Sequence, residues 1–220
     1  MKIEKATLEF LAKLAKNNNR PWFQKNRAPY EAARDNILEV TRFLIGEIAK
    51  FDSSIMGVEE KDCLFRIFRD ARFSKDKSPY KTNFGAFIKS GGRGIAGAGY
   101  YFHVEPGNSM TAGGIYMPPA QELLAIRRAI AKRPVDFEKI ILDKKFTRRF
   151  GGLSDERLKT APKGFPKDHP AIEHLKWKHY IVFRSYTDRD VLSPRYLDRC
   201  LDDFVAMVPF NEYINRVIGR

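Results

Sequence analysis

The chain has few cysteines and no long apolar run. Of its 220 residues only Cys63 and Cys200 are cysteines, and neither lies in a C-x-x-C pair, so we expect two buried, reduced thiols and no disulfide framework. No window approaches the roughly 18 uninterrupted apolar residues of a membrane span. Residues Met1–Lys5 lack the apolar core of a signal peptide. We therefore expect a cytoplasmic protein with no membrane partner.

Common motifs of nucleotide and metal chemistry are also missing. The sequence contains no G-x-x-x-x-G-K-[S/T] loop, no G-x-S-x-G elbow and no H-E-x-x-H pair. Residues 92–97 match G-x-G-x-x-G, but a strand follows them, whereas a helix follows the dinucleotide-binding motif. We therefore interpret them as a hairpin connection, in which Arg93 could line a ligand site without forming a nucleotide-binding fold. The spacing of five between His169, His174 and His179 spreads these side chains around a helix. We expect no metal site, and the sequence leaves the identity of any cofactor unknown.

Positive charge is in excess. The chain holds 40 Lys and Arg against 27 Asp and Glu, a net charge of +13, with 43% hydrophobic and 13% aromatic residues, as in globular proteins. Residues 61–100 carry 9 basic and 3 acidic side chains, and residues 121–150 carry 9 and 4. A positive field attracts polyanions, and it also keeps copies of a soluble protein apart. The charge alone therefore leaves both interpretations open.

Apolar residues at helical spacing organise both ends of the chain. They predict helices over 7–16 and within 20–50, and again over 118–133 and in a short stretch from Pro134. Ser193-Pro194 is typical of a helix start, because serine caps and proline fits the first turn. We expect a separate last helix over Asn211–Ile218.

Strands are expected in the middle of the chain. Short turns between consecutive strands favour antiparallel pairing. The fold class is therefore α+β, with one mostly antiparallel sheet of about five strands flanked by N-terminal and C-terminal helices. We expect a single domain over 1–220 that is helical in 1–60, β-rich in 61–117, helical and loop-like in 118–176, and a strand followed by helices in 179–220. The five strand candidates are Cys63–Phe68, Phe84–Lys89, Gly99–Glu105, Met110–Met117 and His179–Tyr186.

The densest chemistry lies between residues 66 and 82. Strand alternation would put Arg66, Phe68 and Asp70 on one face and Arg69 on the other. Arginine forks suit phosphate or carboxylate, lysine adds a point charge, and an aspartate can orient the arginines. We predict an anion-binding site whose ligand-binding residues are Arg66, Arg69, Asp70, Arg72, Lys77 and Lys81.

Two side chains are candidates for moving a proton. Tyr80 follows the Ser-Pro turn beside these lysines, and His169 lies in an Asp-His-Pro turn. If the protein is an enzyme, we expect Tyr80 or His169 to be catalytic. His103 alternates with Phe102 and Val104 on a strand, so it faces a cleft or is a hydrogen-bonded core histidine.

The pattern R-x-x-R-D-x-R-F-x-x-D-K-x-x-Y-K, which runs from Arg66 to Lys81, resembles the signature of a mainly bacterial family of conserved hypothetical proteins of unknown function. The segments 18–23 (Asn-Asn-Arg-Pro-Trp-Phe), 99–103 (Gly-Tyr-Tyr-Phe-His) and 162–170 are also similar to that family. The resemblance implies a single α+β domain and supplies no reaction and no catalytic residue.

Three functions remain open from the residues. The first is a pocket for a phosphate- or carboxylate-bearing small molecule. The second is a nucleic-acid-binding module that uses the basic segments as a contact face, with aromatic side chains stacking on bases. The third is a structural or interaction protein in which the arginines and aspartates form a buried ion network, whose disruption would cost about 3–5 kcal/mol.

Overall fold

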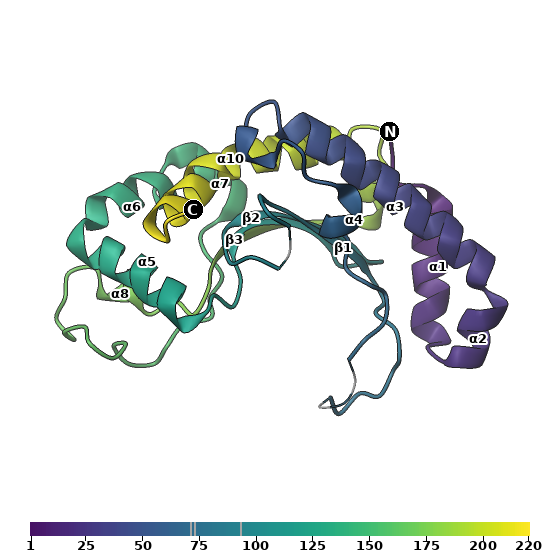
Figure 1. Ribbon diagram of the computed structural model, residues 1–220, viewed down its shortest axis with the longest axis horizontal. Helices are drawn as coiled ribbons and strands as arrows, with labels where there is room; N and C mark the ends of the chain where they lie inside the picture. The colour runs from purple at the N-terminus through teal and green to yellow at the C-terminus, as the bar shows by residue number, and fades with distance from the viewer. Residues whose placement is uncertain (71, 73, 93) are drawn as a thin grey trace. The chain divides into compact units, whose positions relative to one another are not determined.

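The structure is a computed structural model that describes residues 1–70, 72, 74–92 and 94–220 (Figure 1). Arg93, expected in the glycine-rich connection, and Phe73 of the signature lie outside the described residues. The chain divides into two compact units, and the single domain expected over 1–220 stays a prediction. Unit 1 comprises Met1–Arg93, Tyr101–Thr111 and Ser185–Asp202, and unit 2 comprises Gly94–Tyr100, Ala112–Arg184 and Asp203–Arg220.

One antiparallel sheet of four strands in the order β1-β2-β3-β4 confirms the α+β class. A tight turn joins β2 to β3, in which the N–H of Asn108 donates to the carbonyl of Glu105 at 3.0 Å and Gly107 has a φ of 75°. Each strand overlaps a predicted one. The strands are β1 (Phe84–Ile88), β2 (Gly99–Val104), β3 (Ser109–Ile115) and β4 (Tyr180–Tyr186).

The expected strand over Cys63–Phe68 is the main correction to the sheet. A short helix, α4 (Glu60–Cys63), occupies its start, and the rest pairs only through isolated antiparallel bridges, Leu64 with Ala86 and Phe68 with Tyr80. Three residues separate Leu64 from Phe68, whereas five residues separate their bridge partners Tyr80 and Ala86. Because a regular antiparallel ladder needs equal spacing, the two extra residues interrupt it. The described sheet therefore has four strands and not about five.

The helices of unit 1 have the predicted apolar spacing. Leu11 and Leu14 of α1 and Ile37, Val40 and Leu44 of α3 are completely buried, and α1 packs against α3. Burial of this stripe stabilises the pair by removing apolar surface from water. The helical segments are α1 (Lys5–Lys16), α2 (Arg20–Lys25), α3 (Arg27–Ile48), the 3₁₀ turn η1 (Ser53–Ile55), α4 and α9 (Asp188–Val191).

Unit 2 has an aromatic core centred on Phe137. This side chain is completely buried, and its ring lies 5.4 Å from Tyr213 and 5.9 Å from Tyr180, centroid to centroid. The helix α7 was not predicted separately. The helices of this unit are α5 (Ala120–Lys132), α6 (Pro134–Ile141), α7 (Lys144–Phe150) and α8 (Ile172–Leu175).

The C-terminal helix corrects a second expectation. A single helix, α10 (Tyr196–Val217), replaces the two predicted ones and continues through Pro209. Proline removes one backbone donor, which leaves the carbonyl of Val205 without its helical partner. Val205 is half exposed, so water can reach this turn. None of the described helices is long and apolar enough to cross a membrane.

Candidate functional site

The side-chain amide of Asn18 holds the turn that carries Tyr80. Its Nδ2 donates to the carbonyl oxygen of Tyr80 at 2.9 Å, and its Oδ1 accepts from the N–H of Tyr80 at 3.1 Å. On either side of Tyr80, the N–H of Arg69 donates to Pro79 and the N–H of Lys81 donates to Ile67. Asn18 therefore pairs with the backbone as a neighbouring strand would.

Three aromatic rings, that of Tyr80 among them, pack together at this turn. Phe23 stacks on Tyr80 with centroids 4.0 Å apart and planes at 13°, and Phe68 lies 5.4 Å from Tyr80. Phe23 and Tyr80 are buried, whereas Phe68 is 47% exposed. The rings form a rigid floor with one accessible aromatic face.

A hollow of about 800 Å³ opens above this floor, entirely within unit 1. Five of its lining side chains are cationic and one is a carboxylate. Two of the lining residues, Arg20 and Gln24, come from α2. Asn19 caps the N-terminus of this helix, because its side chain accepts a hydrogen bond from the N–H of Trp22 at 3.0 Å. The hollow, called the basic pocket below, is lined by Arg20, Gln24, Arg66, Phe68, Arg69, Asp70, Arg72, Lys77, Pro79 and Tyr80.

Asp76 positions Arg69 at the pocket. Its Oδ1 accepts from the N–H of Ser78 at 2.8 Å and from the hydroxyl of Ser78 at 2.6 Å, while its Oδ2 pairs with Nη1 of Arg69. The hydrogen bond from the Ser78 hydroxyl, followed by that from Arg69, holds the pKa of Asp76 well below its ordinary value. Asp76 therefore stays ionised and fixes one arginine fork.

Asp70 and Arg72 form a second, bidentate pair. The distances are 2.9 Å from Nε of Arg72 to Oδ1 and 2.7 Å from Nη2 to Oδ2. The hydrogen bond from Arg72 lowers the pKa of Asp70. The pair is exposed, with side-chain exposures of 78% for Arg72 and 44% for Asp70. An orienting role of Asp70 for the arginines stays a prediction.

Two of the pocket arginines form no ion pair with a described carboxylate. Arg20 and Arg66 are both exposed, and no Asp or Glu oxygen among the described residues lies within ion-pair distance of them. The charge of Arg66 also lowers the pKa of Asp70. The basic pocket therefore has cationic charge that its own carboxylate does not neutralise.

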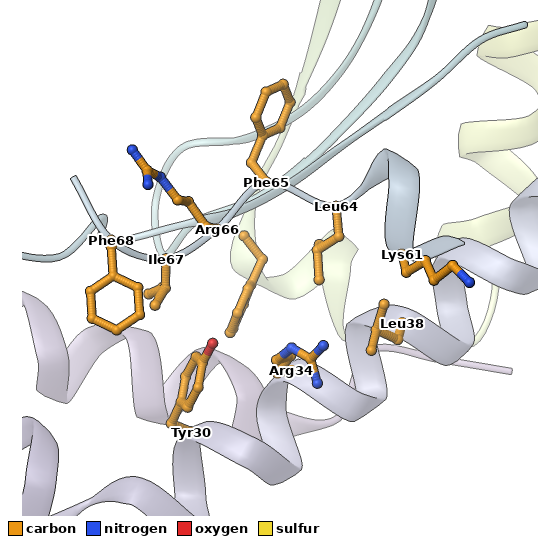
Figure 2. A pocket seen from close by; sticks show the side chains of 10 residues that line it. Tyr30, Arg34, Leu38, Lys61, Leu64, Phe65, Arg66, Ile67 and Phe68 are labelled. Atoms are coloured by element: carbon orange, nitrogen blue, oxygen red, sulfur yellow. The ribbon is translucent and has the colours of Figure 1, made fainter. Parts of the chain in front are cut away.

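A second, smaller hollow of about 220 Å³ lies beside Arg66 and Phe68, which line both. Figure 2 shows Ile67 and Phe68 directed towards Tyr30 of α3 and the guanidinium of Arg66 directed away from it. Strict strand alternation would have put Arg66 and Phe68 on the same face. The interrupted pairing between the two bridges explains the difference, and it lets Arg69 line the basic pocket together with Arg66.

The structure does not bring every predicted site residue into the basic pocket. Lys81 is not among its lining residues, and its Nζ lies 5.2 Å from the ring centre of Phe65. His169 belongs to unit 2, where its Nδ1 accepts from the N–H of Ala171 at 3.1 Å. Tyr80 lines the pocket but is 3% exposed and stacked. Catalytic roles for Tyr80 and His169 stay predictions.

The sequence reasoning assigned no role to Arg20, Gln24 or Pro79. Arg20 and Gln24 reach the pocket because Asn18 and Phe23 contact Tyr80, about 60 residues away in the sequence. No spacing rule predicts such a contact. Within the described ranges, no group of three His, Cys, Asp or Glu side chains is placed to hold a metal ion.

A family model of conserved hypothetical proteins, DUF2461, matches residues 6–213. The chain therefore belongs to this family, as the resemblance implied. No curated protein and no solved structure matches the chain.

Proposed function

We propose that the basic pocket binds a small molecule that carries a phosphate or carboxylate group. The observation that carries the proposal is the charge of the lining, five cations against one carboxylate. Arginine forks bind such groups through paired, charge-assisted hydrogen bonds. Arg66 and Arg20 supply the first contacts, and Arg69 and Arg72 are held ready by their aspartates.

The exposure of the ion pairs favours this function over a buried ion network. Side chains such as Arg72 and Asp70 reach solvent, and exposed pairs contribute little to stability. Their removal would therefore weaken ligand binding more than it would weaken folding. A network that served stability alone would be expected to bury its charges.

Thermal unfolding in the presence of pyrophosphate and of citrate tests the proposal, with sodium chloride at equal ionic strength as the reference. A ligand present at 100 times its Kd stabilises a protein by about 2.7 kcal/mol, which raises the Tm of a chain of this size by roughly 5–10 °C. We expect such a shift with at least one of the two anions. We expect Arg66→Gln to unfold at the wild-type temperature without ligand and to lose most of the shift.

Arg195→Gln is the matched control, because Arg195 is an exposed arginine of unit 1 outside the pocket lining. It removes the same charge and should keep the full shift. Equal losses in both variants would mean that the anion responds to net charge, and the pocket would not be the binding site. A Tm that neither anion moves beyond the chloride reference would also refute the proposal.

A nucleic-acid strand is the second candidate, and the exposed ring of Phe68 beside the arginines favours it. Base stacking on an aromatic side chain contributes about 1–3 kcal/mol. A fluorescent single-stranded oligonucleotide should then bind with an affinity that falls linearly in log salt, and Phe68→Ala should weaken binding about tenfold or more. A pocket for a small anion predicts no binding of the oligonucleotide that depends on Phe68.

A further inference from the structure

A second polar cluster in unit 1 lies on β2 and at the residue that directly follows it, apart from the lining of the basic pocket. Tyr101, His103 and Glu105 alternate along the chain, so they share one side of the strand. The residues between them, such as Phe102 and Val104, are buried on the other side. Tyr101 and Glu105 are partly exposed, and His103 between them is 8% exposed.

Hydrogen bonds join the three side chains in a row. The hydroxyl oxygen of Tyr101 lies 2.9 Å from Nδ1 of His103, and Nε2 of His103 lies 3.2 Å from Oε2 of Glu105. Glu105 is fixed in turn, because its carboxylate accepts from the hydroxyl of Thr82 at 2.6 Å and from the amide of Asn108 at 2.9 Å. The order carboxylate, imidazole, hydroxyl is that of a nucleophile activated by a base and an orienting acid.

The protonation states follow from the partners. A carboxylate only accepts, so Nε2 of His103 carries the proton and Nδ1 is the acceptor, both for the Tyr101 hydroxyl and for the Asn83 amide at 3.3 Å. Burial lowers the pKa of His103, so the imidazole is neutral at pH 7. Burial raises the pKa of Tyr101 to about 12, so the phenol keeps its proton until a base takes it.

Gly85 of β1 makes room for the Tyr101 hydroxyl. A Cβ atom at position 85 would lie 2.5 Å from the hydroxyl oxygen of Tyr101 and 3.1 Å from the ring. Any other residue would therefore displace the phenol from Nδ1 of His103. Gly85 is a positioning residue for this row.

Lys81 brings a positive charge to the same neighbourhood. Its Nζ lies 5.2 Å from the ring centre of Phe65, and the ring of Phe65 lies 6.2 Å from that of Tyr101 in an edge-to-face arrangement. This lysine is absent from the lining of the basic pocket. Lys81 and Tyr101 therefore contact the same aromatic ring, and an anionic substrate that spans this ring would be attracted by the lysine.

We propose that Glu105, His103 and Tyr101 form a proton relay that makes Tyr101 a nucleophile towards an activated acyl compound carrying a negative charge. The Tyr101 oxygen bonds to the acyl carbon while the bond from that carbon to its leaving group breaks. The phenolic proton passes to Nδ1 of His103 and then to the leaving group, and Glu105 accepts from Nε2 throughout. Water later hydrolyses the tyrosyl ester, which restores the phenol.

The test uses 4-(fluorosulfonyl)benzoate as an anionic probe, with tandem mass spectrometry to locate the product. Here the Tyr101 oxygen bonds to sulfur, fluoride leaves, and the proton goes to His103. A general base contributes about 10²–10⁴-fold, so we expect His103→Asn to label Tyr101 at least 100-fold more slowly than wild type. Gly85→Ala should also slow labelling strongly, since it moves the phenol, while its circular dichroism spectrum stays that of wild type.

The variant Lys81→Ala tests whether the substrate is anionic independently of the proton relay. It should slow labelling by the anionic probe about threefold or more and leave labelling by neutral benzenesulfonyl fluoride unchanged. Equal rates for Lys81→Ala and wild type with the anionic probe would remove the anionic substrate from the proposal.

The dependence of the labelling rate on pH is measured on the wild type, so this test does not require that a variant fold. Among the described residues, the titratable side chains that hydrogen-bond to His103 are Tyr101 and Glu105. With the relay, labelling is constant from pH 7.5 to 9.5, because His103 is already neutral. Without the relay, the labelling rate rises tenfold per pH unit, because it follows the fraction of Tyr101 that is ionised to phenolate. That rise, or labelling of exposed Tyr116 without any at Tyr101, would overturn the relay.

Discussion

Replacement of Asn18 by alanine should loosen the floor of the basic pocket. The change removes two hydrogen bonds to the backbone of Tyr80, of 2.9 and 3.1 Å, in a part-buried place. A typical hydrogen bond contributes about 1 kcal/mol net, and a donor or acceptor left unsatisfied costs about 1–3 kcal/mol. Because water can reach one side of a part-buried site, we expect a loss of about 2–3 kcal/mol.

The assay is urea unfolding at pH 7, supported by thermal unfolding. A loss of about 2–3 kcal/mol lowers the Tm of a chain of this size by roughly 4–12 °C. Asn17→Ala is the matched control, because the Asn17 side chain donates only to the exposed carbonyl of Lys13 at 2.9 Å. It should cost about 0.5 kcal/mol or less. Equal costs for the two variants would show that the contact between Asn18 and Tyr80 does not hold the pocket together.

Three further changes test the fold away from the pocket. Asp203→Ala should cost about 3–5 kcal/mol in urea unfolding, because the buried carboxylate pairs with two arginines at 2.7 and 3.2 Å, whereas Asp198→Ala at an exposed position of α10 should cost less than about 0.5 kcal/mol. Gly114→Ala should reduce the yield of folded protein sharply, because Gly114 has a φ of 105° and a Cβ there would lie 2.0 Å from the carbonyl oxygen of Tyr180. Burial lowers the pKa of His103 in the folded protein below its unfolded value of 6.5, so its contribution to stability is present above pH 6.5 and is lost as the pH falls through the folded pKa. The free energy of unfolding in urea should therefore fall less between pH 7 and pH 5 in His103→Asn than in wild type.

Helical spacing predicted the helices well, because burial follows directly from a 3.6-residue period. Ile37, Val40, Leu44 and Ile48 recur at this spacing within the helical stretch predicted over 20–50, and all four are completely buried. The strands of the sheet were found within a few residues from their composition and from the turns between them, although burial in β2 does not alternate: Tyr101 is its one residue that is not buried.

Contacts between distant residues were beyond the reach of periodicity. The segment after Cys63 has the composition of a strand, but its pairing depends on the two extra residues between Tyr80 and Ala86. The clustering of Arg66, Arg69, Asp70, Arg72 and Lys77 follows from their closeness in sequence, so it was predictable. The participation of α2 was not predictable, because it rests on contacts of Asn18 and Phe23 with Tyr80, which lies 62 residues after Asn18 in the sequence.

Alternation did contain a signal for the relay on β2. Tyr101, His103 and Glu105 stand two residues apart, the spacing that aligns side chains on one side of a strand. His103 was considered from the sequence only beside its apolar neighbours, as a core or cleft residue. The hydrogen bonds to Tyr101 and Glu105 show that it is satisfied within a polar row.

Nuclear magnetic resonance titration with whichever of pyrophosphate and citrate raises the Tm tests the anion pocket most directly. The account predicts saturable shifts of backbone amide signals in two separate stretches, around Arg20 and Gln24 and over residues 66–80, and their disappearance in Arg66→Gln. Arg195→Gln should titrate as wild type does. Shifts spread over the basic residues 121–150, or no saturable shift at low salt, would contradict the account.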